Sequence, residues 1–224
     1  MSFETSCSTC GAPSGPSVGV CPYCKTPFTS VKPANPALSS MRDAFQQGRL
    51  QEALAQGSAM KNLPKYSDDG EFLVLWGKVL FESEGPGGTV ASIFAKAAAA
   101  GGDHADEAQL YFLISAANSE LRRGLNDPGE NKLQTLLQSH PQNPHILFTL
   151  GTHLFWVDQS SDQAMRYLEL CVQARPAMPR AWGCLFAIHK SRGDKVNMKR
   201  CRDQFLKYDN SEDARKLMDA QMAE

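Results

Sequence analysis

The chain has 224 residues, a formal net charge of −1 and a hydrophobic fraction of 42%. Such a chain is long enough for one domain with a core and a small accessory module, and its balanced charge excludes a global attraction to nucleic acids or membranes. The N-terminus lacks the basic and apolar regions of a signal peptide, and no apolar run reaches the length of a membrane span, so we expect a cytoplasmic protein.

Four cysteines near the N-terminus form two C-x2-C pairs, Cys7 with Cys10 and Cys21 with Cys24. Two such turns that face each other supply four thiolates, the tetrahedral shell that Zn²⁺ accepts in closed structural sites. Gly11 can take the positive φ that wraps the backbone back toward the sulfurs. In a cytoplasmic protein, paired cysteines indicate a metal more often than a disulfide. The pattern predicts one structural zinc ion.

The string CSTCGAPSGPSVGVCPYCKTPF resembles the short zinc-ribbon module found at the ends of many bacterial proteins. The resemblance covers roughly residues 5–28, departs from the module at Lys25, where glycine is usual, and implies a zinc ribbon over residues 1–28 with the four cysteines as ligands. Three other uses of the cysteines stay open. They are a redox dithiol in the CPYC string, iron in a rubredoxin-like site, and disulfides in an oxidising compartment.

Residues 29–36, TSVKPANP, contain two prolines and few apolar residues, which predicts a linker. Beyond the linker, the sequence contains internal repeats. Turn residues recur about every 34 to 39 positions, at Gly48, Gly85, Gly124, Asp158 and Gly193. Prolines that would close a second helix follow at Pro64, Pro141 and Pro176. A repeat of this length indicates an array of helix pairs.

The period and layout resemble the tetratricopeptide repeat, most clearly over residues 144–176, where Leu147, Leu150, Gly151 and Leu154 occupy its first-helix positions. The resemblance implies an all-α solenoid of antiparallel helix pairs over residues 37–224. The amphipathic segment 211–223 would form a final capping helix with a polar outer face. An unrelated helical array is the alternative fold. Cys171, Cys184 and Cys201 fall on apolar helix positions and are expected to be small buried residues.

Stacked helix pairs leave a concave surface lined by their first helices. The resemblance implies that this groove binds a peptide or helix of another protein. Aromatic and arginine side chains are favoured as binding anchors. The predicted partner-binding residues are Arg42, Phe45, Lys78, Phe81, Tyr111, Asn118, Phe148, Thr152, Phe155, Trp156 and Arg180. Some repeats of this family clamp a partner's terminal carboxylate, for which Arg42, Lys78 and Asn118 form only an incomplete set.

Motifs of catalysis are scarce. The five histidines form no H-E-x-x-H arrangement, and GPGGT at 85–89 lacks the G-K-[ST] of a phosphate-binding loop, so no enzymatic activity is expected. The leading hypothesis is a cytoplasmic bacterial adaptor or scaffold that binds another protein. The alternative is a nucleic-acid-binding protein that uses the ribbon and the basic stretch 175–207, which contains nine Lys and Arg residues and two Asp.

Overall fold

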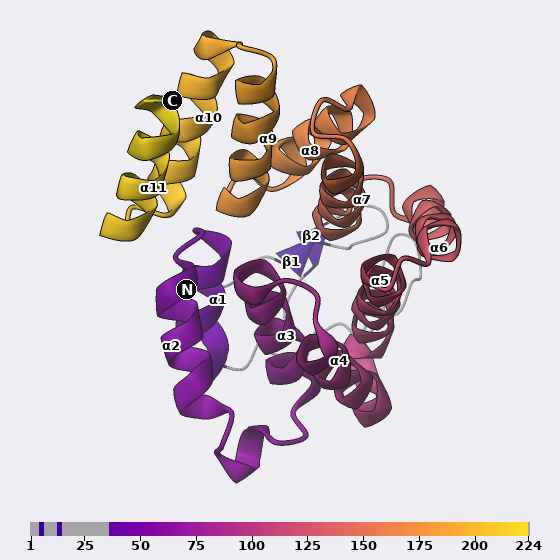
Figure 1. The fold of residues 1–224 in the computed structure, drawn as a ribbon. Coiled ribbons are helices and arrows are strands. Elements are labelled where there is room, and N and C mark those ends of the chain that lie inside the picture. The colour runs from indigo at the N-terminus through magenta and orange to yellow at the C-terminus, as the bar shows by residue number, and fades with distance from the viewer. Residues whose placement is uncertain (1–4, 7–12, 15–35, 224) are drawn as a thin grey trace. The chain divides into compact units, whose positions relative to one another are not determined.

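A computed structural model describes residues 5–6, 13–14 and 36–223 (Figure 1). The chain divides into two compact units, residues 1–39 and 40–224. In the first unit, strand β1 (Thr5–Ser6) pairs antiparallel with β2 (Pro13–Ser14), so that Thr5 lies opposite Ser14. A 3-10 helix, η1 (Pro36–Leu38), lies near the end of this unit. Cys7, Cys10, Cys21 and Cys24 lie outside the described residues, as does most of the predicted ribbon and its linker.

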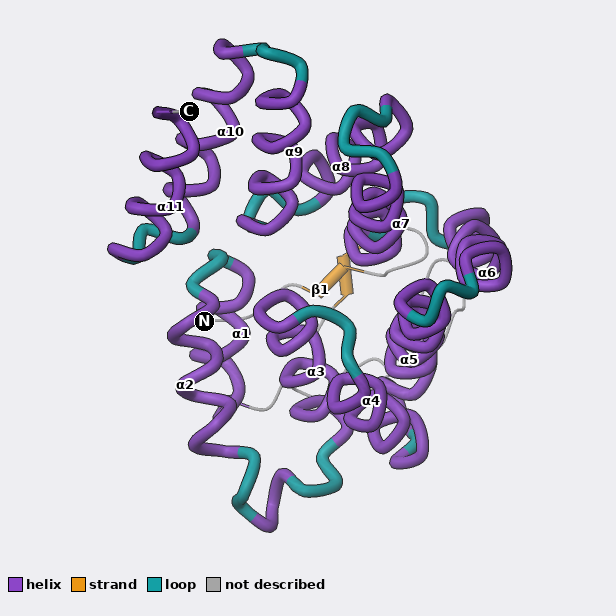
Figure 2. The backbone as a smooth tube through the Cα atoms, in the orientation of Figure 1, coloured by secondary structure: helices purple, strands orange, loops and turns teal. Residues whose placement is uncertain are grey.

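In the described residues of the second unit, all regular secondary structure is helical, and loops connect the helices (Figure 2). From α2 onward each helix packs on the next one along the chain, which confirms the predicted all-helical array. Two further 3-10 turns, η2 (Pro64–Tyr66) and η3 (Gly102–His104), join helix pairs. The eleven α-helices of the described chain are α1 (Ser39–Gln46), α2 (Leu50–Met60), α3 (Gly70–Glu84), α4 (Gly88–Ala100), α5 (Ala105–Arg122), α6 (Asn126–Ser139), α7 (Pro144–Val157), α8 (Asp162–Ala174), α9 (Pro179–Ser191), α10 (Lys195–Tyr208) and α11 (Glu212–Ala223).

The turns inside the helix pairs are where the repeat spacing predicts them. Gly48, Gly85, Gly124 and Gly193 separate α1 from α2, α3 from α4, α5 from α6, and α9 from α10, with φ between 68° and 90°. Residues with a side chain rarely adopt this backbone conformation, so glycine allows the sharp reversal. Asp158 ends α7 at the remaining pair.

Close packing within a helix pair depends on small residues at the contact between its two helices. A Cβ added to Gly151 of α7 would lie 2.8 Å from the side chain of Leu168 in α8, so these two helices approach more closely than a larger residue would permit. At the start of α7 the Asn143 side chain accepts hydrogen bonds from the backbone N–H groups of His145 and Ile146. Such a cap satisfies donors that a helix start otherwise leaves unpaired.

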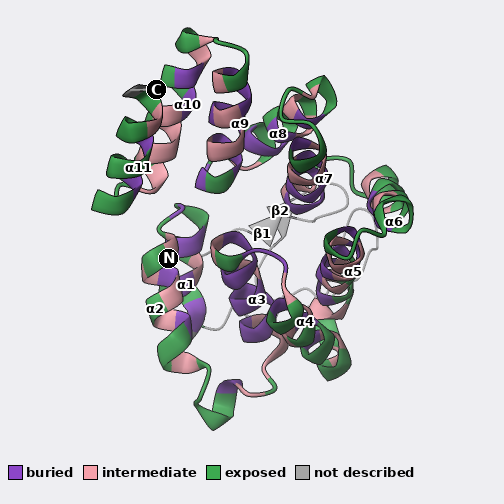
Figure 3. Ribbon diagram, in the orientation of Figure 1, coloured by how far each residue is buried: buried purple, intermediate pink, exposed green. Residues whose placement is uncertain are grey.

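The first helix pair of the second unit also contacts the last pairs. Gly48, in the α1–α2 turn, lies so close to Ala177 and Tyr208 that an added Cβ would come within 2.9 Å of a side-chain atom of each. Figure 3 shows the buried residues gathered on the helix sides that face one another, while α6 and α11 present mostly exposed residues. Among the described residues, no helix combines the length and the apolar character needed to cross a membrane.

Candidate functional site

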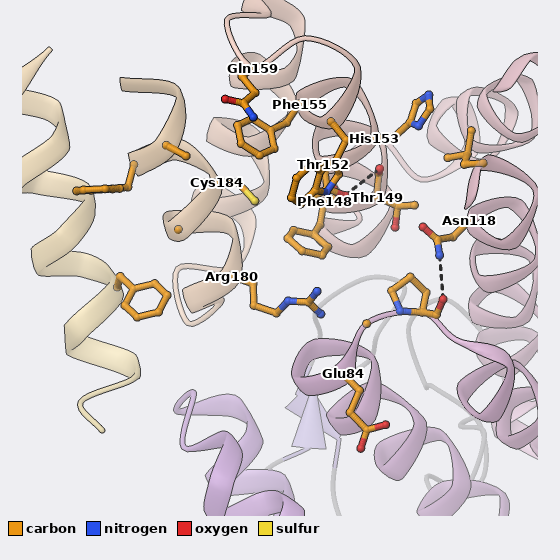
Figure 4. A pocket seen from close by; sticks show the side chains of 18 of the residues that line it. Glu84, Asn118, Phe148, Thr149, Thr152, His153, Phe155, Gln159, Arg180 and Cys184 are labelled. Atoms are coloured by element: carbon orange, nitrogen blue, oxygen red, sulfur yellow. Dashed lines mark hydrogen bonds between the residues drawn. The ribbon is translucent and has the colours of Figure 1, made fainter. Parts of the chain in front are cut away.

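A groove of about 850 Å³ lies between the ends of α3 and α5, the sides of α7 and α9, and helix α11 (Figure 4). All of its lining residues belong to the second unit. Its floor is apolar and buried, and is made by Phe148 and Phe155 of α7, Phe186 of α9 and Met218 of α11. Phe148 and Phe155 share one face of α7 because they are seven residues, or two helical turns, apart.

The rim of the groove exposes large apolar side chains. Trp156 is 75% exposed and Leu217 is 55% exposed. The Trp156 ring meets Phe155 edge-on, with 5.4 Å between ring centroids. An exposed tryptophan beside an apolar floor is typical of a surface that another molecule covers, because the contact would remove this area from water.

Three polar side chains that line the groove, those of Asn118, Thr152 and His153, are hydrogen-bonded within the protein and fix its walls. The Asn118 side chain donates to the Pro86 carbonyl at 2.8 Å, and the Thr152 hydroxyl donates to the Phe148 carbonyl at 2.8 Å. His153 Nε2 lies 2.9 Å from a carboxylate oxygen of Glu130. The walls are therefore defined before any partner arrives.

Three charged side chains line the groove, namely Arg122 at the end of α5, Arg180 at the start of α9, and Glu84 at the end of α3. Arg180 lies with its guanidinium carbon 5.5 Å from the centre of the Phe148 ring. In Figure 4 the Arg180 side chain extends from α9 toward α7, whereas Glu84 is directed away from it. Partial burial, and to a smaller degree the charge of Arg122, lower the pKa of Arg180. An arginine stays protonated at physiological pH all the same.

A buried polar network joins α3, α5, α7 and the end of α8. His145 Nδ1 lies 2.9 Å from the Tyr111 hydroxyl, and His145 Nε2 lies 2.8 Å from Glu82. Arg175 donates to both carboxylate oxygens of Glu82 and, at 2.9 Å, to the Phe45 carbonyl. Its guanidinium carbon also lies 4.2 Å from the centre of the Phe45 ring.

The protonation state of this network follows from burial. Desolvation raises the pKa of Tyr111 and lowers the pKa of His145, although the nearby Glu82 acts in the opposite direction on the histidine. The phenol thus keeps its proton and donates to Nδ1, and a neutral imidazole carries its hydrogen on Nε2 and donates to Glu82. Every member of the network has a partner, which is the condition for a stable buried polar cluster.

No protein-family model matches the chain, and no curated protein matches it. In the described part of the chain, no three His, Cys, Asp or Glu side chains are placed to share a metal ion.

The structure brings six of the predicted partner-binding residues together in the groove, and these are Asn118, Phe148, Thr152, Phe155, Trp156 and Arg180. Phe45, Phe81 and Tyr111 are buried instead of facing outward. The reason is that these side chains face α7 and Arg175, the residue that follows α8, and not the solvent. The Phe81 ring centroid lies 5.1 Å from that of His145, and Arg175 covers Phe45.

The two remaining predicted residues are held in ion pairs. Arg42 pairs with Glu71, and Lys78 pairs with Glu107. The Asn118 side chain donates a hydrogen bond to the Pro86 carbonyl. All three residues of the incomplete carboxylate clamp therefore have partners within the protein.

Sequence reasoning did not anticipate the contribution of Arg122, Phe205, Leu217, Met218 and Gln221 to the groove. The sequence contains an arginine near a predicted turn and an apolar stripe in the last helix, but the direction of these side chains depends on how the helix pairs stack. Cys171 and Cys201 are buried as predicted, whereas Cys184 is half-buried and lines the groove. Burial raises the pKa of the Cys184 thiol to about 11.

Proposed function

We propose that the protein is an adaptor or scaffold that binds a segment of another protein in the groove between α7, α9 and α11. The observation that carries the proposal is the 75% exposure of Trp156 at the rim of an apolar floor. Tryptophan, tyrosine and arginine dominate the binding energy of protein interfaces, and the groove presents Trp156 and Arg180 together. The tetratricopeptide-like repeat layout supports the same function, because solenoids of this kind bind along their inner surface.

The N-terminal cysteines supply the second element of the proposal. Four thiolates in two C-x2-C pairs fit a tetrahedral zinc ion, so Cys7, Cys10, Cys21 and Cys24 would hold one Zn²⁺. The metal would stabilise a segment too short to build its own core. This zinc ribbon would act as a structural and accessory docking module beside the helical groove.

Nucleic-acid binding through the basic stretch 175–207 has less support among the described residues. Arg175 is engaged by Glu82, Arg192 by Asp162, and Arg202 by Asp203 and Asp219. Arginines neutralised within the protein contribute little to the release of counterions on which such binding depends.

Site-specific photo-crosslinking tests the proposal. A photoreactive residue placed at Gln159, in the groove, should give a discrete protein adduct in cells, and the Trp156→Ala substitution should abolish it. The matched control places the same probe at Val196, which is 81% exposed and lies outside the groove. Adducts of equal yield at both positions, or an adduct insensitive to Trp156→Ala, would show that the groove is not the binding site.

A further inference from the structure

We propose that the partner segment carries a carboxylate next to a large apolar side chain, and that Arg122 and Arg180 hold the carboxylate while the apolar group enters the groove. The inference depends on the proposed function and specifies the chemistry of the partner. Arg122 and Arg180 both face this groove.

Arg180 lies at a position where the dipole of its own helix disfavours a positive charge. It is the second residue of α9, and the positive end of a helix dipole disfavours a cation there. Within the described residues, no carboxylate forms an ion pair with it. The guanidinium is nevertheless fixed in position, because it lies against the Phe148 ring and an added Cβ on Gly85 would be 3.0 Å from its Nη1 atom. A fixed, uncompensated guanidinium with a fork of donors suits a carboxylate.

Arg122 adds a second positive charge to the same groove. It is exposed at the end of α5 and, in the part of the chain that the structure describes, forms no ion pair. By contrast, Lys78 of α3 is neutralised by Glu107, and Arg175 at the end of α8 is neutralised by Glu82. Since Glu84 points away from Arg180, the two arginines leave an excess of positive charge that an incoming anion would balance.

The surroundings of the two arginines favour a peptide carboxylate over a phosphate. Phe148 and Phe155 form a buried apolar floor beside Arg180, and Trp156 and Leu217 extend it to the surface. A ligand that satisfies both features needs an acidic group and an apolar side chain within a few ångströms of each other. A short acidic and apolar peptide meets this requirement, whereas a phosphate group by itself offers charge without the apolar part.

The test is a selection from random 12-residue peptides fused to a carrier at their C-termini, so that side chains supply the only peptide carboxylates. The full-length protein is the target, and a second library with free C-termini shows whether a terminal carboxylate serves instead. Enriched sequences should pair Asp or Glu with an aromatic or large aliphatic residue. Affinity for an enriched peptide should fall at least about ten-fold for Arg180→Ala and for Arg122→Ala, the loss expected for one charge-assisted contact.

Two controls isolate the contact. Lys199→Ala removes an exposed positive charge of α10 outside the groove and should leave affinity unchanged. Replacing the acidic residue of the peptide by its amide should weaken binding to the wild type, with little further loss when Arg180→Ala is added, because both changes remove the same contact.

The outcomes separate this inference from the proposed function. Enriched peptides without acidic residues, bound through Trp156 but not through either arginine, would overturn the inference and leave the proposed function standing. Preferential binding of a single-stranded RNA 12-mer that depends on Arg122 and Arg180 would also overturn it. Failure to obtain any peptide whose binding depends on Trp156 would contradict both.

Discussion

Arg175, at the end of α8, donates a hydrogen bond to the backbone carbonyl of Phe45 at the end of α1, 130 residues earlier in the chain. The same guanidinium forms a buried ion pair with Glu82 of α3. One side chain thus connects the first, second and fourth helix pairs. We infer that this connection fixes the curvature of the array and thereby the shape of the groove.

The first prediction concerns the loss of this arginine. Arg175→Met should lower the free energy of unfolding by about 3–5 kcal/mol, because it leaves the buried Glu82 carboxylate without its cation. Urea denaturation followed by circular dichroism measures the change. The matched control, Arg192→Met, removes an ion pair with the exposed Asp162 and should cost less than about 1 kcal/mol. Equal effects of the two substitutions would mean that the buried connection does not stabilise the array.

The second prediction concerns the contact between the first and last helix pairs. Gly48 and Gly124 both adopt positive φ, 75° and 77°, so alanine at either position carries a similar backbone penalty of about 1 kcal/mol. Only at Gly48 would the new Cβ meet Ala177 and Tyr208, since Gly124 has open space around it. Gly48→Ala should therefore destabilise the protein more than Gly124→Ala, as measured by their thermal midpoints. Equal losses would show that the pairs do not touch in solution.

The third prediction concerns pH. Burial lowers the pKa of His145, so below about pH 6.5, the ordinary histidine pKa, the unfolded chain takes up a proton that the folded protein resists. The unfolded state then binds more protons, and the free energy of unfolding falls as the pH drops, by up to about 1.4 kcal/mol per pH unit. Above about pH 6.5, where the imidazole is neutral in both the folded and the unfolded chain, the full free energy of unfolding is retained. His145→Gln should flatten this dependence between pH 6.5 and 5, whereas the exposed His140→Gln should retain it.

The fourth prediction concerns the N-terminal cysteines. Cys21→Ser should remove most of the bound zinc while leaving the helical circular-dichroism signal nearly unchanged, because residues 1–39 and 40–224 form separate compact units. Metal analysis of the purified protein should find one zinc per chain before the substitution. Iron in place of zinc, or four freely titratable thiols, would contradict the zinc assignment, and a global loss of helix would show that the two units depend on each other.

The sequence predicts the local fold well. The turn glycines at Gly48, Gly85, Gly124 and Gly193 lie where the repeat period requires them, since turn chemistry and helical periodicity are local properties. The curvature of the helical array is not a local property. It depends here on contacts such as Arg175 with Phe45, and it buries Phe81 and Tyr111, which the repeat register alone directs outward.

The residues of the groove also divide into those that local sequence patterns predict and those whose position depends on how the helices stack. Phe148, Phe155 and Trp156 could be predicted because they lie on one helix with a recognisable period. Leu217 and Met218 could not be assigned to the groove, because the position of α11 depends on how it packs against α10.

The most direct measurement of the central claim follows the three tryptophan indole N–H signals by nuclear magnetic resonance while an enriched peptide is added to the intact protein. Trp76 and Trp182 are buried, and Trp182 donates its indole hydrogen to the Pro176 carbonyl, whereas Trp156 is exposed at the rim of the groove. The Trp156 signal should shift in a saturable manner, and the other two should move little. A peptide that binds while the Trp156 signal stays in place would contradict the account.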